Sequence, residues 1–254
     1  MFKKSSIEGK PLLKRMLFNS WSYILWQVDV GFMHTSEDSI HVDLGSGTVP
    51  RNPFFADKLV ALDLNIDEVQ APSNASKVQI VNSNLGNPLP FEDNSIDSVS
   101  AFDVLEHIPR MQMNADEVTY PLVSLMNEIW RILKPGGIFI SLTPAFPSYQ
   151  AFEHPTHVNF MTKGSFSYFV FPGSVSLNEG YGYFGCFEQI VLHWQMGAGP
   201  FEEPKNLKHH QLGLVSGFRK LRDIFRIVYR FSKLIRWRCR PSVRSHILWV
   251  IRKI

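Results

Sequence analysis

Short apolar runs, each bounded by turn residues, divide the first two thirds of the chain. Over residues 39–44 the apolar side chains alternate with His41 and Asp43, and the pattern stops abruptly at Gly45-Ser46-Gly47. Such alternation predicts a short buried strand that ends in a glycine turn. Similar patterns predict further strands over Lys58–Leu64, Val78–Val81, Ile96–Phe102, Ile138–Leu142 and Phe184–Trp194.

Helical spacing appears between these strands. Tyr120–Leu133 carries one apolar stripe and ends at Lys134-Pro135-Gly136-Gly137, a proline and glycine stop signal. Thr162–Phe171 predicts a short helix. Strands that alternate with helical connections are typical of parallel βαβ units. The pattern therefore predicts an α/β fold built on a doubly wound, mostly parallel sheet.

The two ends of the chain differ from this middle part. Apolar residues recur at helical spacing from Leu13 to Val28 and predict an amphipathic helix, which packs on the body or covers a ligand cleft. We therefore divide the chain into a helical N-terminal cap over 1–38, a ligand-binding domain over 39–200 and a basic C-terminal extension over 201–254.

Charge is distributed unevenly along the chain. Residues 1–204 hold 12 Lys/Arg and 22 Asp/Glu, whereas residues 205–254 hold 14 Lys/Arg and the single acid Asp223. Val215–Trp237 has the spacing of a basic amphipathic helix. Three interpretations stay open: peripheral attachment to an anionic membrane surface, packing on the body or on a second subunit, and a grip on nucleic acid, which we favour least.

Cysteine usage and hydropathy bear on localisation. Cys186 and Cys239 lie far apart and lack metal-ligand spacing. Polar residues interrupt the apolar region Met16–Met33, and no stretch has the pattern of a signal peptide or a membrane span. We expect a reduced, cytoplasmic protein, held at the inner face of the membrane if the first interpretation of the basic helix is correct. The pattern does not indicate an oligomeric state.

Polar residues gather where the predicted strands end. Gly45 and Gly47 allow a ligand to approach bare backbone. Asp63 ends the second strand at the distance where an acid accepts hydrogen bonds from ribose hydroxyls. Asn84 and Asp103 follow the next two strands. Because ligands of open α/β sheets bind beyond the carboxyl ends of the strands, these residues predict one nucleotide-like site.

Five segments in this order resemble the motifs of class I S-adenosylmethionine (SAM)-dependent methyltransferases. They are Val42–Thr48, Ala61–Leu64, Pro88–Asp97, Phe102–Ile108 and Leu133–Gly137. The resemblance runs from about Ile40 to Thr162. It implies a Rossmann-like, seven-stranded sheet whose last strand runs antiparallel, with SAM as the cofactor. Val49 and Pro50 stand where a dinucleotide fingerprint would have its third glycine, which disfavours a nicotinamide enzyme.

The resemblance also implies which residues bind the cofactor. Two positions depart from the family pattern: Asn84 replaces the acid that contacts adenine, and Ser46 replaces a cysteine between the glycines. An amide oxygen still accepts a hydrogen bond from the adenine amino group. The implied cofactor-binding residues are Asp43, Gly45, Ser46, Gly47, Asp63, Leu64, Asn84, Leu85, Asp103 and Val104.

The segment after the fifth strand carries the candidate acceptor chemistry. A neutral imidazole is a suitable base for a hydroxyl acceptor near pH 7. His154 and His157 are the leading candidates, and Asp103, His107 and Glu153 are further ones. A hydrogen-bonded structural turn and a metal half-site are alternative interpretations of His154-x-x-His157, although we expect no resident metal ion.

The acceptor itself is inferred from resemblance. Arg51-Asn52-Pro53-Phe54 and His154–Thr162 are similar to segments of bacterial methyltransferases associated with surface-polysaccharide biosynthesis. This implies O-methylation of a saccharide or a lipid-linked glycan. Alternatives are a methyltransferase acting on RNA or on a small molecule such as a quinone, and a non-catalytic protein that binds SAM or a partner.

Overall fold

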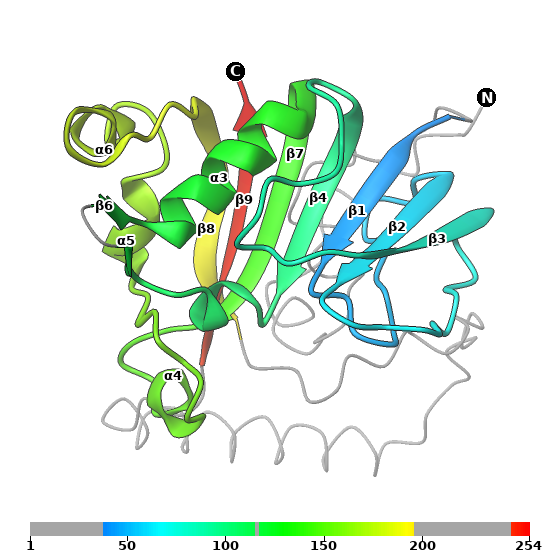
Figure 1. The fold of residues 1–254 in the computed structure, drawn as a ribbon, viewed down its shortest axis with the longest axis horizontal. Coiled ribbons are helices and arrows are strands. Elements are labelled where there is room, and N and C mark those ends of the chain that lie inside the picture. Colours follow the sequence, from blue (N-terminus) through cyan, green and yellow to red (C-terminus); the bar gives the residue numbers. More distant parts are fainter. Residues whose placement is uncertain (1–37, 115–116, 196–244) are drawn as a thin grey trace, which may run out of the picture.

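The computed structural model describes residues 38–114, 117–195 and 245–254. These residues form a seven-stranded sheet in the order β3-β2-β1-β4-β7-β9-β8 (Figure 1). Its strands are β1 (Ile40–Leu44), β2 (Lys58–Asp63), β3 (Lys77–Asn82), β4 (Ile96–Phe102), β7 (Leu133–Pro144), β8 (Phe187–Gln195) and β9 (His246–Lys253). A separate antiparallel pair joins β5 (Gln112–Asn114) to β6 (Glu117–Thr119). The predicted seven-stranded, mostly parallel sheet is confirmed.

Strand directions correct one detail of the expected topology. Strands β1, β2, β3, β4 and β7 are mutually parallel, and β9 pairs antiparallel with both β7 and β8. Strand β8 therefore runs with the parallel set, and the antiparallel strand is β9 rather than Phe184–Trp194. Because β9 lies inside the sheet, a domain boundary at residue 200 would cut off one of its strands.

Strand β9 contributes to the core on both faces of the sheet. Its alternate residues Ile247, Trp249 and Ile251 join the larger apolar cluster, whereas Leu248 and Val250 join the smaller cluster on the other face. A strand covered on both faces has a continuous apolar sequence instead of an alternating one. The run His246–Lys253 has this character.

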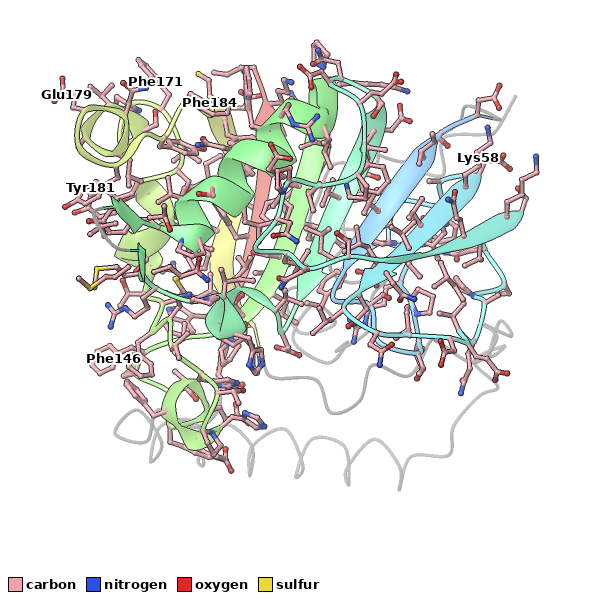
Figure 2. All side chains as sticks on the ribbon, viewed as in Figure 1. Lys58, Phe146, Phe171, Glu179, Tyr181 and Phe184 are labelled. Atoms are coloured by element: carbon pink, nitrogen blue, oxygen red, sulfur yellow. The ribbon has the colours of Figure 1, made fainter. Side chains whose placement is uncertain are left out.

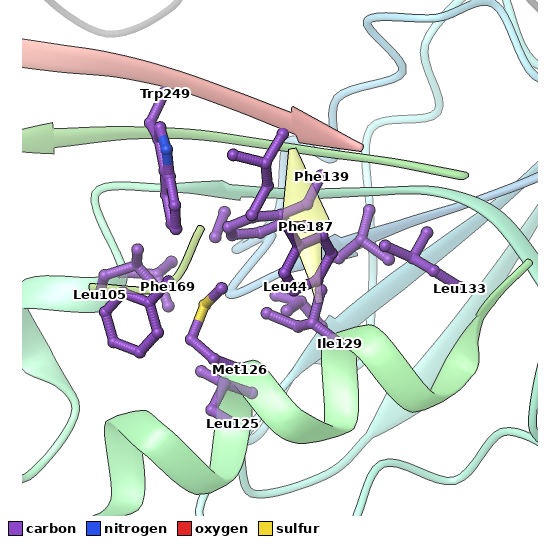
Figure 3. Close-up of a cluster of buried hydrophobic side chains, with 14 of the residues drawn as sticks. Leu44, Leu105, Leu125, Met126, Ile129, Leu133, Phe139, Phe169, Phe187 and Trp249 are labelled. Carbon is purple, nitrogen blue, oxygen red and sulfur yellow. The ribbon is translucent and has the colours of Figure 1, made fainter. Parts of the chain in front are cut away.

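Helix α3 (Pro121–Ile132) covers one face of the sheet (Figure 1). It begins with a proline at a position where the missing N–H costs nothing. Its side chains Leu125, Met126 and Ile129 face Phe139 and Trp249 in the core (Figure 3). Among the described residues, three shorter helices follow β7, namely α4 (Gln150–Glu153), α5 (Lys163–Ser167) and α6 (Ser174–Tyr181).

The end of α3 is fixed by the last strand. Lys253 is buried, and its Nζ donates to the carbonyl oxygens of Trp130 and Leu133 and to Oδ1 of Asn94, each at 2.7 Å. The same Nζ lies 4.1 Å from the centroid of the Trp130 ring. A cation at this end of a helix satisfies the last carbonyls and opposes the helix dipole.

The first connections differ from the expected βαβ pattern. Residues 45–57 and 64–76, which link β1 to β2 and β2 to β3, are turns and bends without a helix. The helices predicted over 13–28 and 215–237 lie outside the described residues. Within the described part of the chain, no helix is long and apolar enough to span a membrane.

Candidate active site

The turn after β1 presents bare backbone. Gly45 and Gly47 have φ values of +62° and +55°, in the left-handed region that glycine adopts without strain. A Cβ on Gly45 would lie 2.4 Å from Cγ2 of Val104, so the turn packs directly against the segment after β4. A Cβ on Gly47 would meet no atom within 4 Å, so its backbone borders open space. Ser46 is buried between the two glycines.

Asp63 ties the tip of β2 to this turn. Its Oδ2 accepts the Gly47 N–H at 2.8 Å, and its Oδ1 accepts the Leu64 N–H at 2.6 Å. The side chain is half-buried, and each carboxylate oxygen keeps a second acceptor site. Leu64 beside it is 66 % exposed, which is unusual for an apolar residue at a strand end. Together they offer an acceptor for hydroxyl groups next to an apolar surface.

Asp43 is buried and faces the protein interior. Its Oδ1 accepts the Ser100 hydroxyl, and its Oδ2 accepts the Arg51 N–H at 2.8 Å. His41 continues the network, with its ring nitrogens 2.8 Å from Ser98 and Ser100. Burial raises the pKa of Asp43 from 3.8 to about 6, although the charge of Arg51 and the two hydrogen bonds oppose this rise. In this structure Asp43 holds the loop after the glycine turn.

Asn84 and Leu85 follow β3. Asn84 is exposed, and its Oδ1 accepts the N–H of Gly86 at 2.8 Å in a local turn. One acceptor site of that oxygen stays available for a ligand. Leu85 is half-buried and packs against the larger core cluster.

The segment Arg51–Phe54 is mainly structural. The Asn52 side chain donates to the Ala56 carbonyl oxygen at 2.8 Å and accepts the Ala56 N–H at 3.0 Å. Phe54 is buried beside the His41 ring. The Arg51 guanidinium lies 5.2 Å from the centroid of the Phe102 ring.

Asp103 meets a histidine that the sequence pattern does not single out. Asp103 follows β4 with a φ of +56°, and its Oδ1 lies 3.1 Å from Nε2 of His246 at the start of β9. Nδ1 of His246 is 2.7 Å from the Ser245 hydroxyl. The sequence feature that could have identified His246 is the polar pair Ser245-His246 directly before an apolar run. Because many cations surround this pair in the sequence, the charge pattern assigns it to the basic C-terminal extension. Val104, the next residue after Asp103, is buried against Gly45.

His107, His154 and His157 form a cluster of three rings. Their ring centroids are 4.8 to 5.6 Å apart, and one ligand nitrogen from each lies within 4.8 Å of the others. The Nδ1 atoms of His107 and His154 both lie against the Thr156 hydroxyl, at 2.7 and 2.8 Å. Burial and the two neighbouring imidazoles lower the pKa of His107. The structure thus brings three of the predicted histidines together, whereas Glu153 is exposed at the end of α4.

Glu106 is a buried acid beside this cluster. It is 1 % exposed, and neither carboxyl oxygen has a hydrogen-bond partner within the described part of the chain. Its Oε1 lies 4.0 Å from Nε2 of His157. Burial raises the pKa of Glu106 to about 8, and the nearby charge of Asp103 adds to this rise. The sequence motif places Glu106 near the site but assigns it no role.

Exposed aromatic rings surround α4. Phe146, Tyr149, Phe152 and Phe160 are each 43 to 56 % exposed, and the rings of Phe152 and Phe160 stack at 4.6 Å (Phe146 is labelled in Figure 2). Phe146 and Phe152 meet edge to face at 6.3 Å. Large exposed apolar patches are typical of surfaces that bind a ligand or a partner. This one follows β7 on the carboxyl side of the sheet.

Taken together, a glycine turn, an acid at the next strand tip and an acid after β4 meet at one edge of a parallel sheet. Residues 42–141 match a family described as "Methyltransferase domain". This stretch of the chain is therefore similar to methyltransferase domains. The matched stretch contains the glycine turn, Asp63, Asp103 and the first histidine of the cluster.

Solved structures of methyltransferases are similar to this chain. A putative methyltransferase from Bacillus halodurans is 16 % identical, with 91 % of this chain and 99 % of that chain covered and a TM-score of 0.48. A SAM-dependent methyltransferase from Archaeoglobus fulgidus is 16 % identical, covering 96 % and 98 %, with a TM-score of 0.48. One from Methanosarcina mazei is 10 % identical, covering 88 % and 95 %, with a TM-score of 0.49. No curated protein matches the chain.

Proposed function

We propose that the chain is a SAM-dependent methyltransferase that methylates a hydroxyl group of a saccharide or a lipid-linked glycan. The observation that carries the reaction class is the arrangement at the carboxyl edge of the methyltransferase domain. There the open backbone of Gly47 is hydrogen-bonded to Asp63 at 2.8 Å, and Val104 packs against Gly45. The residues at this edge fit SAM.

Each part of the cofactor has a matching group in the domain. The space beside Gly47, which a Cβ would partly fill, suits the methionyl and ribose parts. Asp63 offers free acceptor sites to ribose hydroxyls, and exposed Leu64 offers an apolar surface to adenine. Asn84 offers one acceptor site to the adenine amino group. Asp43 contributes by fixing the loop at Arg51.

SAM supplies an activated methyl group on a sulfonium centre. Transfer to a hydroxyl group would form a bond between the acceptor oxygen and the methyl carbon, break the carbon–sulfur bond with its electrons left on sulfur, and release the hydroxyl proton. The domain's own contribution is to align the acceptor, exclude water and receive that proton. We propose the Asp103–His246 pair as the receiving group, because Asp103 directly precedes Val104, which packs on Gly45, and the two side chains are 3.1 Å apart.

His154 and His157 remain predicted bases. Their Nδ1 atoms are engaged, His154 with Thr156 at 2.8 Å and His157 with the Gln150 carbonyl oxygen at 3.1 Å, so a base role would use Nε2. Rates of Asp103→Asn, His246→Ala, His154→Ala and His157→Ala separate the two possibilities. The variant that removes the true base should lose about 10²–10⁴-fold in kcat and should flatten the acidic limb of the pH–rate profile.

The saccharide or glycan acceptor is supported by the exposed rings around α4, which give a sugar or lipid an apolar surface next to the site. An RNA or a quinone-like small molecule could also stack on these exposed rings, so an experiment must distinguish the three acceptors. Transfer of tritiated methyl groups from SAM into fractionated cell extract distinguishes them. Label in glycolipid or polysaccharide supports the proposal, and label confined to RNA or to small molecules rejects the glycan acceptor.

The cofactor claim has its own test. Calorimetry with SAM and S-adenosylhomocysteine should detect one site per folded chain, which separates a binder from a non-binder. Asp63→Ala should weaken SAM binding, whereas the control Asp67→Ala changes an exposed acid in the same loop and should not. No binding by the folded wild type, or equal binding by both variants, contradicts the assignment.

A peripheral membrane location is proposed from charge. Residues 205–244 hold 12 Lys/Arg and one acid, and their flanking strands β8 and β9 meet at the edge that carries the site. Because β9 belongs to the sheet, a deletion of residues 205–254 would remove a core strand. Liposome flotation should instead compare the wild type with Arg219, Arg222 and Arg226 changed to Gln. The control changes three exposed cations elsewhere, Lys77, Arg110 and Lys163. Equal flotation of both variants rejects membrane attachment.

A further inference from the structure

We propose that His107, His154 and His157 form a binding site for a divalent transition-metal ion of the Zn²⁺ type. One ring nitrogen from each residue lies within 4.8 Å of the other two. Imidazole nitrogen is a preferred ligand of Zn²⁺, and three protein ligands with an open fourth position is a common arrangement for this ion.

The hydrogen bonds of the cluster leave lone pairs for a metal. Nδ1 of His157 faces the carbonyl oxygen of Gln150 at 3.1 Å. A carbonyl only accepts, so Nδ1 carries the proton and Nε2 of the neutral ring keeps its lone pair. This contact between a backbone carbonyl and the second ring nitrogen also orients histidines that bind metals in other proteins.

Thr156 imposes a similar constraint on the other two rings. Its hydroxyl lies 2.7 Å from Nδ1 of His107 and 2.8 Å from Nδ1 of His154. A hydroxyl carries one proton and donates to one imidazole at most, so at least one neutral ring must donate from Nδ1. That ring keeps its Nε2 lone pair. The cluster therefore holds at least two free imidazole lone pairs without any rearrangement of hydrogen bonds.

The backbone holds the two contributing segments together. His107 belongs to the short 3₁₀ helix η2 (Leu105–His107), whereas the other two histidines follow α4. The N–H groups of Val158 and Asn159 donate to the Glu106 carbonyl oxygen at 2.8 and 3.1 Å. The buried Asn159 side chain donates to the Leu105 carbonyl oxygen at 3.0 Å and also to that of Ile108. The site is thus fixed by contacts other than those of its ligands.

An independent observation is the buried carboxyl group of Glu106. It is 1 % exposed, lacks a hydrogen-bond partner within the described residues, and lies 4.0 Å from Nε2 of His157. A buried carboxyl group without a partner is costly unless something completes its surroundings. A cation bound by His157 would do so, with Glu106 either as the fourth ligand or next to the bound ion.

The geometry requires a modest contraction. Tetrahedral Zn²⁺ with Zn–N distances of about 2.0–2.1 Å places its ligand nitrogens about 3.4 Å apart. The present spacing of up to 4.8 Å closes by side-chain rotation, which is available because His107 and His154 are exposed. A metal ion would then join the segment after β4 to the segment after α4.

Calorimetric titration of the full chain with ZnSO₄ tests the proposal. We expect one site per chain, a raised Tm with Zn²⁺, and visible absorption bands of tetrahedral coordination when Co²⁺ replaces Zn²⁺. Each of His107→Ala, His154→Ala and His157→Ala should abolish this site. Glu106→Gln should weaken it by about 10–100-fold, as expected for a residue that supports metal ligands.

The matched control changes His209 and His210 to Ala, an adjacent pair of histidines elsewhere in the sequence. This variant should bind Zn²⁺ like the wild type. Absence of a site in the wild type overturns the proposal, as does unchanged affinity in the three cluster variants or loss of binding in the control. If a cluster variant fails to fold, the Co²⁺ spectrum of the wild type still decides, because a spectrum without tetrahedral bands overturns the proposal.

Discussion

Replacing Asp43 with Asn should stabilise the ligand-free protein at neutral pH. Asp43 is buried, and burial raises the pKa of its carboxyl group from 3.8 to about 6. Ionisation of this group at pH 7 therefore opposes folding. Asn has nearly the same shape and carries no charge, so its side chain removes the cost of ionisation and leaves the surrounding packing intact.

The size of the effect follows from the pKa change. A rise from 3.8 to about 6 makes ionisation cost about 3 kcal/mol at pH 7, because one unit corresponds to about 1.4 kcal/mol. Asn cannot accept hydrogen bonds at both positions that now receive Arg51 N–H and the Ser100 hydroxyl. Weakening one of these bonds costs about 1 kcal/mol. We expect Asp43→Asn to gain about 2 kcal/mol at pH 7.

The pH dependence gives a sharper test than the absolute value. Between pH 3.8 and about 6 the folded protein keeps a proton on Asp43 that the unfolded chain has lost, so wild-type stability falls as pH rises through this window. The ionisation cost is about 2 kcal/mol at pH 5 and about 3 kcal/mol at pH 7. The stability difference between Asp43→Asn and the wild type should therefore grow by about 1 kcal/mol from pH 5 to pH 7.

Urea unfolding at both pH values measures this difference, with Asp67→Asn as a control for an exposed acid. The control should show no comparable growth. A difference that stays constant with pH, or an Asp43→Asn variant that is less stable than the wild type at pH 7, would refute the reasoning.

Three further substitutions test the turn and the last strand. Gly45→Ala should destabilise the fold by more than the 1–2 kcal/mol expected for a left-handed residue, because its Cβ would clash with Val104 at 2.4 Å; urea unfolding measures this. Gly47→Ala should cost only that 1–2 kcal/mol but weaken SAM binding in calorimetry, since its Cβ enters open space. Lys253→Met should lower the free energy of unfolding in urea by about 2–4 kcal/mol, because it leaves the Trp130 carbonyl oxygen without its donor. A smaller loss of stability than that of Gly47→Ala would contradict this.

The strands that the sequence locates best are those closed by turn residues. The observed β4 (Ile96–Phe102) coincides with its predicted range, and β2 ends one residue earlier than predicted. These strands are short apolar runs that stop at glycine, asparagine or aspartate, so the local sequence contains both the element and its boundary.

Strand β9 could not be located in the same way. Its apolar run follows a strongly basic stretch and is grouped with it by charge, although a short continuous apolar run is also typical of a strand buried on both faces. Pairing with β7 and β8 is a long-range property. No local sequence pattern indicates that residues 246–253 insert between β7 and β8, two strands that precede them in the sequence.

The same distinction applies to the site. Gly45, Gly47 and Asp63 follow strands directly, so strand prediction places them at one edge. The partnership of Asp103 with His246 depends on β9 and could not be predicted without it. Likewise, the inward orientation of Asp43 depends on Ser100 of a neighbouring strand.

Strand β9 also connects the stability of the fold to the site. At one end, Lys253 binds the carbonyl oxygens at the end of α3, and at the other end His246 lies 3.1 Å from Asp103. Between these two contacts every residue of the strand is buried except Arg252, which is half-buried. A change that shifts β9 along its neighbours would break the helix contact and separate His246 from Asp103 together. The contact of Asp103, the acid after β4, with His246 therefore depends on the register of β9.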